Sequence, residues 1–219
     1  MSLPLAIEMA GGTSGQDIKN AVLRAIGDFR ISGSAIDFGA GTGALLAHLA
    51  ALGCFDDLTG VDYLERPQGM AAHISWLAKD LNEWQPDIEP VDLVVCSEVI
   101  EHLENPRHVV RTIKRLLRPG GTLVLTMPNN ESIRSILSLL YYGHFVAFRD
   151  SCYPAHITAL LRKDMNRIFA ENALQLLETR YTNQGGVPSM PNITWQGLTG
   201  GFLKGRLYSD NVVYICKSI

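Results

Sequence analysis

Three glycines at alternating positions mark a stretch of this sequence that is suited to binding a ligand. Gly39, Gly41 and Gly43 follow the apolar run 34–38 and precede an apolar helical pattern. Glycine lets the backbone approach a ligand closely, and the first N–H groups of a helix face whatever lies beside the turn. The segment 37–43 therefore predicts a ligand-binding turn, and the simpler alternative is a tight connection between a strand and a helix.

The glycine spacing alone leaves the ligand open. Gly39, Gly41 and Ala44 also fit the pattern that binds nicotinamide or flavin dinucleotides. Asp62 lies about 20 residues further on, where an acidic side chain can hold a ribose. So short a motif is weak by itself, and the choice between these ligands depends on the rest of the chain.

A second group of reactive residues follows the apolar run 91–96. Glu98, Glu101 and His102 would lie on one face of a helix, because their spacings are three and four residues. Carboxylates and imidazoles can take a proton from a reacting hydroxyl, and the same set can also hold a metal ion. The plainer alternative is that the glutamates cap or pair locally while His102 packs beneath the segment.

The elements that must position these residues alternate between strands and helices. Apolar runs predict strands at 34–38, 58–62, 74–78, 91–96, 122–127, 174–181 and 211–216. Helical spacing predicts helices at 18–29, 44–52, 131–142 and 163–171, and another from Pro106 to a stop at 119–121. The alternation implies an α/β fold with a mostly parallel sheet. No full helical crossover separates the last two strands, which predicts an antiparallel last strand.

Two helix starts have recognisable capping residues. Ser14 followed by Asp17 resembles a capping box for the first helix, and Asn105 followed by Pro106 suits a cap and first helical residue. Between Asp62 and the strand at 74–78 there is little room for a helix, so we expect that side of the sheet to be open or covered by another element.

Composition sets limits on location and partners. The 219 residues suffice for one domain spanning 1–219, and the net charge of −3 gives no reason to expect a nucleic acid or an anionic membrane as partner. The four cysteines lack zinc-site spacing, and no leader segment is evident, which favours reduced thiols in a cytoplasmic protein. The most apolar stretch, 136–148, is shorter than the ~20 residues that span a bilayer.

Five segments in a fixed order settle the choice of ligand. They are AIDFGAGTG at 35–43, GVDY at 60–63, KDL at 79–81, VDLVVCSEVIEHL at 91–103 and LRPGGTLVLTMPN at 117–129. Together they resemble the class I S-adenosylmethionine-dependent methyltransferases, most closely the branch of ubiquinone-type O-methyltransferases. The resemblance implies a Rossmann-like three-layer sandwich with a seven-stranded sheet. It also implies S-adenosyl-L-methionine as methyl donor and S-adenosyl-L-homocysteine as product.

The resemblance also implies roles for individual residues. Asp62 would accept hydrogen bonds from both ribose hydroxyls, and Asp80 would contact the adenine amino group. Asp37 would support the turn or the amino group of the donor. The alternatives are a strand-end cap for Asp62 and a solvated turn residue for Asp80. The implied donor site comprises Asp37, Gly39, Ala40, Gly41, Thr42, Gly43, Asp62, Tyr63, Asp80, Leu81 and Ser97.

Removal of a proton from the acceptor falls to residues after the fourth predicted strand. His102, with Glu98 and His156, are the candidates for this chemistry, which needs no metal. Small-RNA 2′-O-methyltransferases also resemble this segment. In them two glutamates, the adjacent histidine and a later histidine bind a metal, which would correspond here to Glu98, Glu101, His102 and His156. The segment 152–155 departs from their pattern.

A substrate cover is expected at about 129–158, where this fold commonly carries one. Its aromatic residues would suit an apolar or aromatic acceptor, and ordinary packing or a subunit contact is the alternative. The glycine-rich segment 185–205 could cover the same pocket. We expect a methyltransferase acting on an oxygen atom of a small molecule. The alternatives are a metal-assisted RNA 2′-O-methyltransferase, a non-catalytic S-adenosylmethionine-binding protein and an NAD-dependent oxidoreductase.

Overall fold

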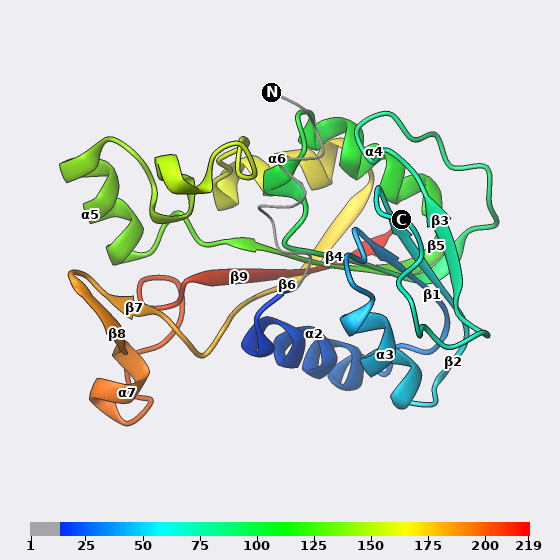
Figure 1. Cartoon of the computed structure of the whole chain (residues 1–219), viewed down its shortest axis with the longest axis horizontal. Coiled ribbons are helices and arrows are strands. Elements are labelled where there is room, and N and C mark those ends of the chain that lie inside the picture. Colours follow the sequence, from blue (N-terminus) through cyan, green and yellow to red (C-terminus); the bar gives the residue numbers. More distant parts are fainter. Residues whose placement is uncertain (1–13) are drawn as a thin grey trace.

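Seven strands form one twisted sheet with helices on both faces (Figure 1). The structure, a computed structural model, describes residues 14–219, so the first 13 residues of the expected domain 1–219 lie outside it. The sheet has the order β3-β2-β1-β4-β5-β9-β6. Its strands are β1 (Gly33–Phe38), β2 (Phe55–Asp62), β3 (Ser75–Ala78), β4 (Val91–Ser97), β5 (Leu117–Pro128), β6 (Leu174–Tyr181) and β9 (Asn211–Ser218).

Strand directions agree with the expected topology. β1, β2, β3, β4 and β5 pair in parallel, whereas β9 runs antiparallel to both β5 and β6. The carboxyl ends of the parallel strands therefore meet at one edge, and the beginning of β9 lies at that same edge. The predicted α/β three-layer sandwich with an antiparallel last strand is confirmed.

The two faces of the sheet bury separate apolar layers. Helices α2 (Gln16–Asp28) and α3 (Ala44–Ala51) cover one face, and α4 (Pro106–Leu116) and α6 (Arg162–Glu171) cover the other (Figure 1). Along β4, Leu93 packs with the first layer and Val94 with the second, as the two-residue period of a strand requires. Burying each such side chain contributes about 1.5–3 kcal/mol. Two packed layers thus hold the strand ends in place.

Two local predictions were wrong. Helix α2 begins after Gly15 without a side-chain cap, and the Ser14 hydroxyl instead lies 3.1 Å from the Ser97 hydroxyl. Ser14 is therefore drawn to β4, not to the helix end. Strand β5 begins at Leu117, earlier than expected, because 119–121 forms an irregularity inside the strand where the pairing register with β4 shifts. Glycine and proline here bend a strand, as they do at bulges.

The connection between β2 and β3 contains no helix, as expected; all of residues 63–74 are described. Instead of a helix, this segment forms a loop that the Arg66 guanidinium holds together by donating to the backbone carbonyls of Met70, Ala71 and Ile74. The Trp76 Nε1 donates to the Leu64 carbonyl at 2.9 Å. One arginine and one tryptophan thus organise this loop beside the glycine turn.

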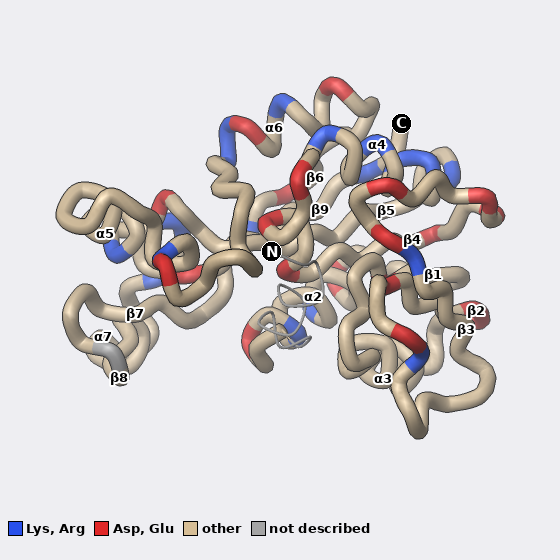
Figure 2. Tube along the Cα trace, turned by 45° about the horizontal axis from the view of Figure 1, so that its top comes forward, with Lys and Arg blue, Asp and Glu red and all other residues tan. Residues whose placement is uncertain are grey.

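Beyond the carboxyl edge, the chain forms a separate lobe (Figure 1). It consists of α5 (Ile133–Tyr142), the 3-10 turns η2 (Val146–Phe148) and η3 (Asp150–Cys152), the hairpin β7 (Gly186–Val187) and β8 (Met190–Thr194), and α7 (Trp195–Thr199). Sequence reasoning missed the hairpin and α7. Figure 2 shows few charged residues on α5, α7 and the hairpin. Among residues 14–219, no helix is long and apolar enough to cross a membrane.

The base of this lobe is fastened to the sheet by polar groups. The Asn129 amide donates to the carbonyls of Arg206 and Ser209, both at 2.7 Å, and Arg134 pairs with Asp210 at 3.0 Å. Tyr141 and Tyr142 are 78% and 74% exposed, so these two aromatic rings do not belong to the core. The lobe is thus held at its base while its apolar outer side faces solvent.

Candidate active site

A cavity of about 300 Å³ opens at the carboxyl ends of β1, β2 and β4. It contains most of the residues that the sequence proposed for a ligand site. Thr42 and Gly43 are the exceptions, since Thr42 is exposed and Gly43 lies beneath Met70. The predicted residues that line the cavity are Asp37, Gly39, Ala40, Gly41, Asp62, Tyr63, Asp80, Leu81, Ser97, Glu98, Glu101, His102 and His156.

The glycine turn requires glycine for two separate reasons. Gly39 has a φ of +84°, and an added Cβ there would collide with the methyl groups of Val99. Gly39 and Ala40 both donate their N–H groups to the Val61 carbonyl, at 2.8 and 3.1 Å. The turn is therefore fixed to β2, and its residues Gly39, Ala40 and Gly41 line the cavity.

Asp62 joins the turn to the end of β2. One carboxylate oxygen accepts the Gly41 N–H at 2.7 Å, and the other accepts the Leu64 N–H at 2.9 Å. Each carboxylate oxygen can accept a second hydrogen bond, so capacity remains for two ligand hydroxyls. The carboxylate thus orders the turn and still presents acceptors to the cavity.

Two further carboxylates line the same end of the cavity. Asp37 is buried, and burial, followed by the charge of Asp62, raises its pKa to about 7. A cationic ligand group beside it would favour its ionised form. Asp80 accepts the Asn82 N–H at 2.9 Å and so forms a local turn while it lines the cavity. Three carboxylates therefore line one end of the cavity and favour a ligand with hydroxyl or cationic groups there.

Glu98 and Glu101 do not share a helical face, so that prediction was wrong. After β4, the helical turn is confined to the 3-10 segment η1 (Ile100–His102), and Glu98 precedes it with a φ of +56°. The Glu98 carboxylate accepts the Thr126 hydroxyl at 2.8 Å and the Asn211 amide at 2.7 Å. Burial nevertheless raises the pKa of Glu98 above its ordinary range.

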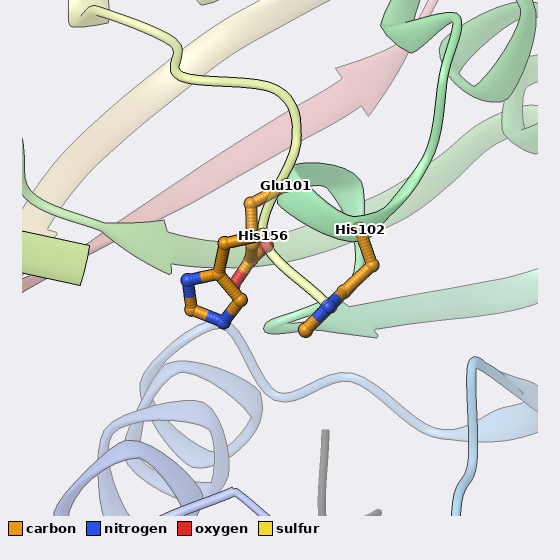
Figure 3. Close-up of side chains that lie close together, drawn as sticks. All are labelled: Glu101, His102 and His156. Atoms are coloured by element: carbon orange, nitrogen blue, oxygen red, sulfur yellow. The ribbon is translucent and has the colours of Figure 1, made fainter. Parts of the chain in front are cut away.

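Glu101, His102 and His156 do converge (Figure 3). One ligand-type atom from each lies within 4.8 Å of the others, and the two imidazole rings are 4.6 Å apart. Glu98 is not part of this group. The backbone carbonyl of Glu101 accepts the N–H groups of Ile157 and Thr158, both at 3.0 Å, which holds the His156 segment against η1.

The hydrogen bonds of the two histidines fix their tautomers. His102 Nδ1 lies 2.8 Å from the Ala155 carbonyl, and His156 Nδ1 lies 2.7 Å from the Ala147 carbonyl. A carbonyl can only accept, so each Nδ1 carries the proton and each neutral ring keeps a lone pair on Nε2. Burial lowers the pKa of both histidines, and His156 lowers that of His102 further. Both rings are therefore neutral bases at neutral pH.

Glu101 is the least satisfied group in the cavity. It is 2% exposed, and neither carboxylate oxygen has a hydrogen-bond partner within the described residues. Burial, reinforced by Glu98, raises the pKa of Glu101 well above its ordinary range. Burial thus favours the protonated form of this side chain, and a ligand donor or a cation beside it would favour the ionised form.

Sequence reasoning missed the residues that reach the cavity from a distance. Ser14, Gly15, Ile18 and Lys19 form one wall, and Asn211 contacts Glu98 from β9. Because the spacing of Ser14 predicted a helix cap, its contact with Ser97 was not expected. No local pattern marked Asn211, because its partner lies 113 positions earlier in the chain.

Comparisons with known proteins agree with this geometry. A family model described as a methyltransferase domain matches residues 13–179. The chain is 31% identical over 105 residues to the ubiquinone biosynthesis O-methyltransferase of Dechloromonas aromatica, covering 44% of each chain. It is 32% identical over 156 residues to that of Aeromonas salmonicida, covering 61% of this chain and 65% of the relative. The matches thus span less than two thirds of these relatives.

Solved structures show the same fold at low sequence identity. A S-adenosylmethionine-dependent methyltransferase from Archaeoglobus fulgidus superposes with a TM-score of 0.66 at 16% identity, covering 99% of this chain and 100% of that one. The 1,6-didemethyltoxoflavin-N1-methyltransferase of Burkholderia thailandensis, solved with S-adenosylhomocysteine, has a TM-score of 0.62 at 12% identity. That match covers 93% of this chain and 78% of the other.

Proposed function

The chain belongs to the class I S-adenosylmethionine-dependent methyltransferases, and from this premise we propose that it methylates an oxygen atom of a small-molecule acceptor. The donor supplies an electrophilic methyl group on a sulfonium. The protein's share of the work is to hold the two reactants in line, to exclude water and to remove the acceptor proton.

The donor fits the carboxylate-rich end of the cavity. The turn residues Gly39, Ala40 and Gly41 line this end of the cavity, and Asp62 has acceptors left for two ribose hydroxyls. Asp37 provides a buried carboxyl that a cationic amino group would ionise, and Asp80 and Leu81 lie where the adenine would rest. These assignments require Asp62 to act both on the turn and on the ligand.

One observation carries the assignment of the base: His102 lines the cavity, and its neutral ring has a lone pair on Nε2. Its Nδ1 proton is committed to the Ala155 carbonyl, so proton uptake can occur only at Nε2. His156 stands edge-on at 4.6 Å and is held in the same tautomer. We assign His102 as the base, with His156 and Glu98 as groups that touch the acceptor.

The surroundings of His156 support an apolar or aromatic acceptor. The Phe148 ring lies 5.6 Å from the His156 ring, so the segment 129–158 packs an aromatic side chain against one of the histidines that line the cavity. The charge-poor lobe favours an apolar or aromatic acceptor, and the curated relatives are named as O-methyltransferases. We therefore propose phenols and catechols as probe acceptors and the lobe as the substrate cover.

The test compares two histidine variants. His102→Ala should lower the rate of methyl transfer to a phenol by about 10²- to 10⁴-fold, the usual contribution of a general base, while S-adenosylhomocysteine still binds as in the parent. His108→Ala, on α4 outside the cavity, is the matched control and should leave both unchanged. Label from tritiated S-adenosylmethionine that reaches nitrogen compounds but no hydroxyl compound would contradict oxygen transfer.

The orphaned Glu101 carboxyl supports a second candidate, a divalent cation held by Glu101, His102 and His156. Carboxylate oxygen and imidazole nitrogen suit such ions, and the raised pKa of Glu101 means that binding would release a proton. In a manganese titration, binding that is lost in Glu101→Gln but kept in Glu104→Gln, at an exposed neighbour, would support a metal role. His102 would then be a ligand instead of the base.

A further inference from the structure

Glu98 lines the cavity and occupies a strained backbone position. Its φ of +56° lies in the left-handed region, which residues other than glycine seldom adopt. Such strain costs on the order of 1–3 kcal/mol and persists where surrounding contacts enforce it, often at functional sites. The contacts that enforce it here come from two other strands.

Hydrogen bonds from β5 and β9 fix Glu98. Its N–H donates to both the carbonyl and the hydroxyl oxygen of Thr126, each at 3.1 Å. The Thr126 hydroxyl donates to Oε1 at 2.8 Å, and the Asn211 amide donates to Oε2 at 2.7 Å. Each carboxylate oxygen thus has one protein donor and keeps capacity for one more hydrogen bond. The orientation of the carboxylate is set while its remaining acceptor sites stay free for a ligand.

The hydrogen bonds that end on Glu98 continue through neighbouring hydroxyl groups as far as Ser14. The single proton of the Thr126 hydroxyl is given to Glu98, so the Ser97 hydroxyl, at 3.1 Å, must donate to Thr126. The Ser14 hydroxyl, 3.1 Å from Ser97, then donates in turn. Four residues therefore form one directed chain that ends on Glu98.

Asn211 can do this because of the sheet topology. It is the first residue of β9, and it is paired with Pro128 at the end of β5. Its carbonyl accepts the Thr182 N–H at 3.1 Å, so the backbone is held on both sides. An antiparallel strand begins where its parallel neighbours end, which brings Asn211 to the carboxyl edge. A rigid strand end is a precise support for a side chain.

We infer that Asn211 and Thr126 are positioning residues that aim the Glu98 carboxylate at the acceptor. The inference rests on the proposed function, in which Glu98 touches the acceptor. Each positioning residue donates to one oxygen of the Glu98 carboxylate: Thr126 to Oε1 and Asn211 to Oε2. An aspartate at position 211 would keep the shape of asparagine but would place an acceptor and a charge against Glu98.

The kinetic test uses isosteric pairs. Asn211→Asp and Thr126→Val should lower kcat for the phenol that the parent methylates by roughly 10- to 100-fold, because a displaced catalytic group costs about that much. Binding of S-adenosylhomocysteine should stay unchanged, and Thr126→Ser, which keeps the hydroxyl, should restore kcat. Asn172→Asp, which alters a bond at the end of α6, is the control. Parent-like kcat in Asn211→Asp, or equal loss in Thr126→Ser and Thr126→Val, would overturn the inference.

A structural test works without any acceptor. Crystals of Asn211→Asp should show the Glu98 carboxylate turned out of its present position, whereas Asn172→Asp should show it unmoved. An unmoved Glu98 in Asn211→Asp would refute the positioning role, whatever the parent methylates. Failure of the parent to methylate any hydroxyl compound would contradict oxygen transfer alone, because the crystallographic outcome is read independently.

Discussion

The assignment of Asp62 makes a quantitative prediction about donor binding. In Asp62→Ala the N–H groups of Gly41 and Leu64 lose their acceptors, and on the proposed assignment the two ribose hydroxyls lose theirs as well. Hydrogen bonds to charged groups contribute about 1.5–3 kcal/mol each. Taking the lower value for two ribose bonds gives about 3 kcal/mol, or roughly a hundredfold weaker binding.

Disorder of the turn adds to this loss. Gly41 depends on Asp62 for its orientation, so the alanine variant should also be less stable by about 1–3 kcal/mol, the cost of an unsatisfied donor. Asp62→Asn should bind weakly too, because one amide N–H₂ would face a backbone N–H. Because asparagine has the size of aspartate, Asp62→Asn tests whether binding needs the carboxylate acceptors or only a side chain of that size.

Calorimetry with S-adenosylhomocysteine measures the effect directly. Asp57→Ala is the matched control, since it removes the same charge from an exposed position on the same strand. The control should bind like the parent and melt at a similar temperature. A dissociation constant for Asp62→Ala within about threefold of the parent value, less than 1 kcal/mol, would refute the assigned ribose contact.

Three further outcomes are expected. Gly39→Ala should abolish donor binding and cost about 1–3 kcal/mol of stability, because its Cβ meets Val99 and displaces the turn. Gly205→Ala, with a similar φ of +87° and open space around it, should keep binding, and equal binding in both variants would contradict a role of the Gly39 turn in holding the donor. Asp37→Asn should raise the melting temperature of the free protein more at pH 8 than at pH 5. The pKa of Asp37 is raised from 3.8 to about 7, so this side chain destabilises the fold increasingly as pH rises through that window. Equal shifts in melting temperature at the two pH values would contradict the raised pKa. The low-pH limb of methyl transfer should have its midpoint below the ordinary histidine value of about 6.5, because burial lowers the pKa of His102, and a midpoint above it would exclude His102 as base.

Elements with a strong local pattern were predicted closely. Strand β6 and helix α4 have the expected bounds or nearly so, and the Asn105 side chain accepts the His108 N–H at 3.0 Å as a helix cap should. Apolar periodicity reports which face is buried, and capping residues act within one turn. Such features depend only on neighbours in the chain.

Predictions failed where a side chain forms its hydrogen bonds with residues far away in the sequence. Ser14 had the spacing of a helix cap, yet its hydroxyl reaches Ser97 on β4. Glu98 had helical spacing to Glu101, yet hydrogen bonds to Thr126 and Asn211 hold it outside the helical turn. In both cases a polar group is satisfied by a strand far away in the sequence, and local spacing carries no record of that strand.

The sequence by itself determined the fold and most residues at the carboxylate-rich end of the cavity, because a glycine turn, a strand-end acid and alternating apolar runs are all recognised within a few residues. Only the tertiary structure decided how the acceptor end is built. It brought His156 to His102 and Asn211 to Glu98, and it left Glu101 buried without a partner. These contacts arise from sheet pairing and the folding of a lobe over the strand ends, and the forces that select them act between segments that share no local pattern.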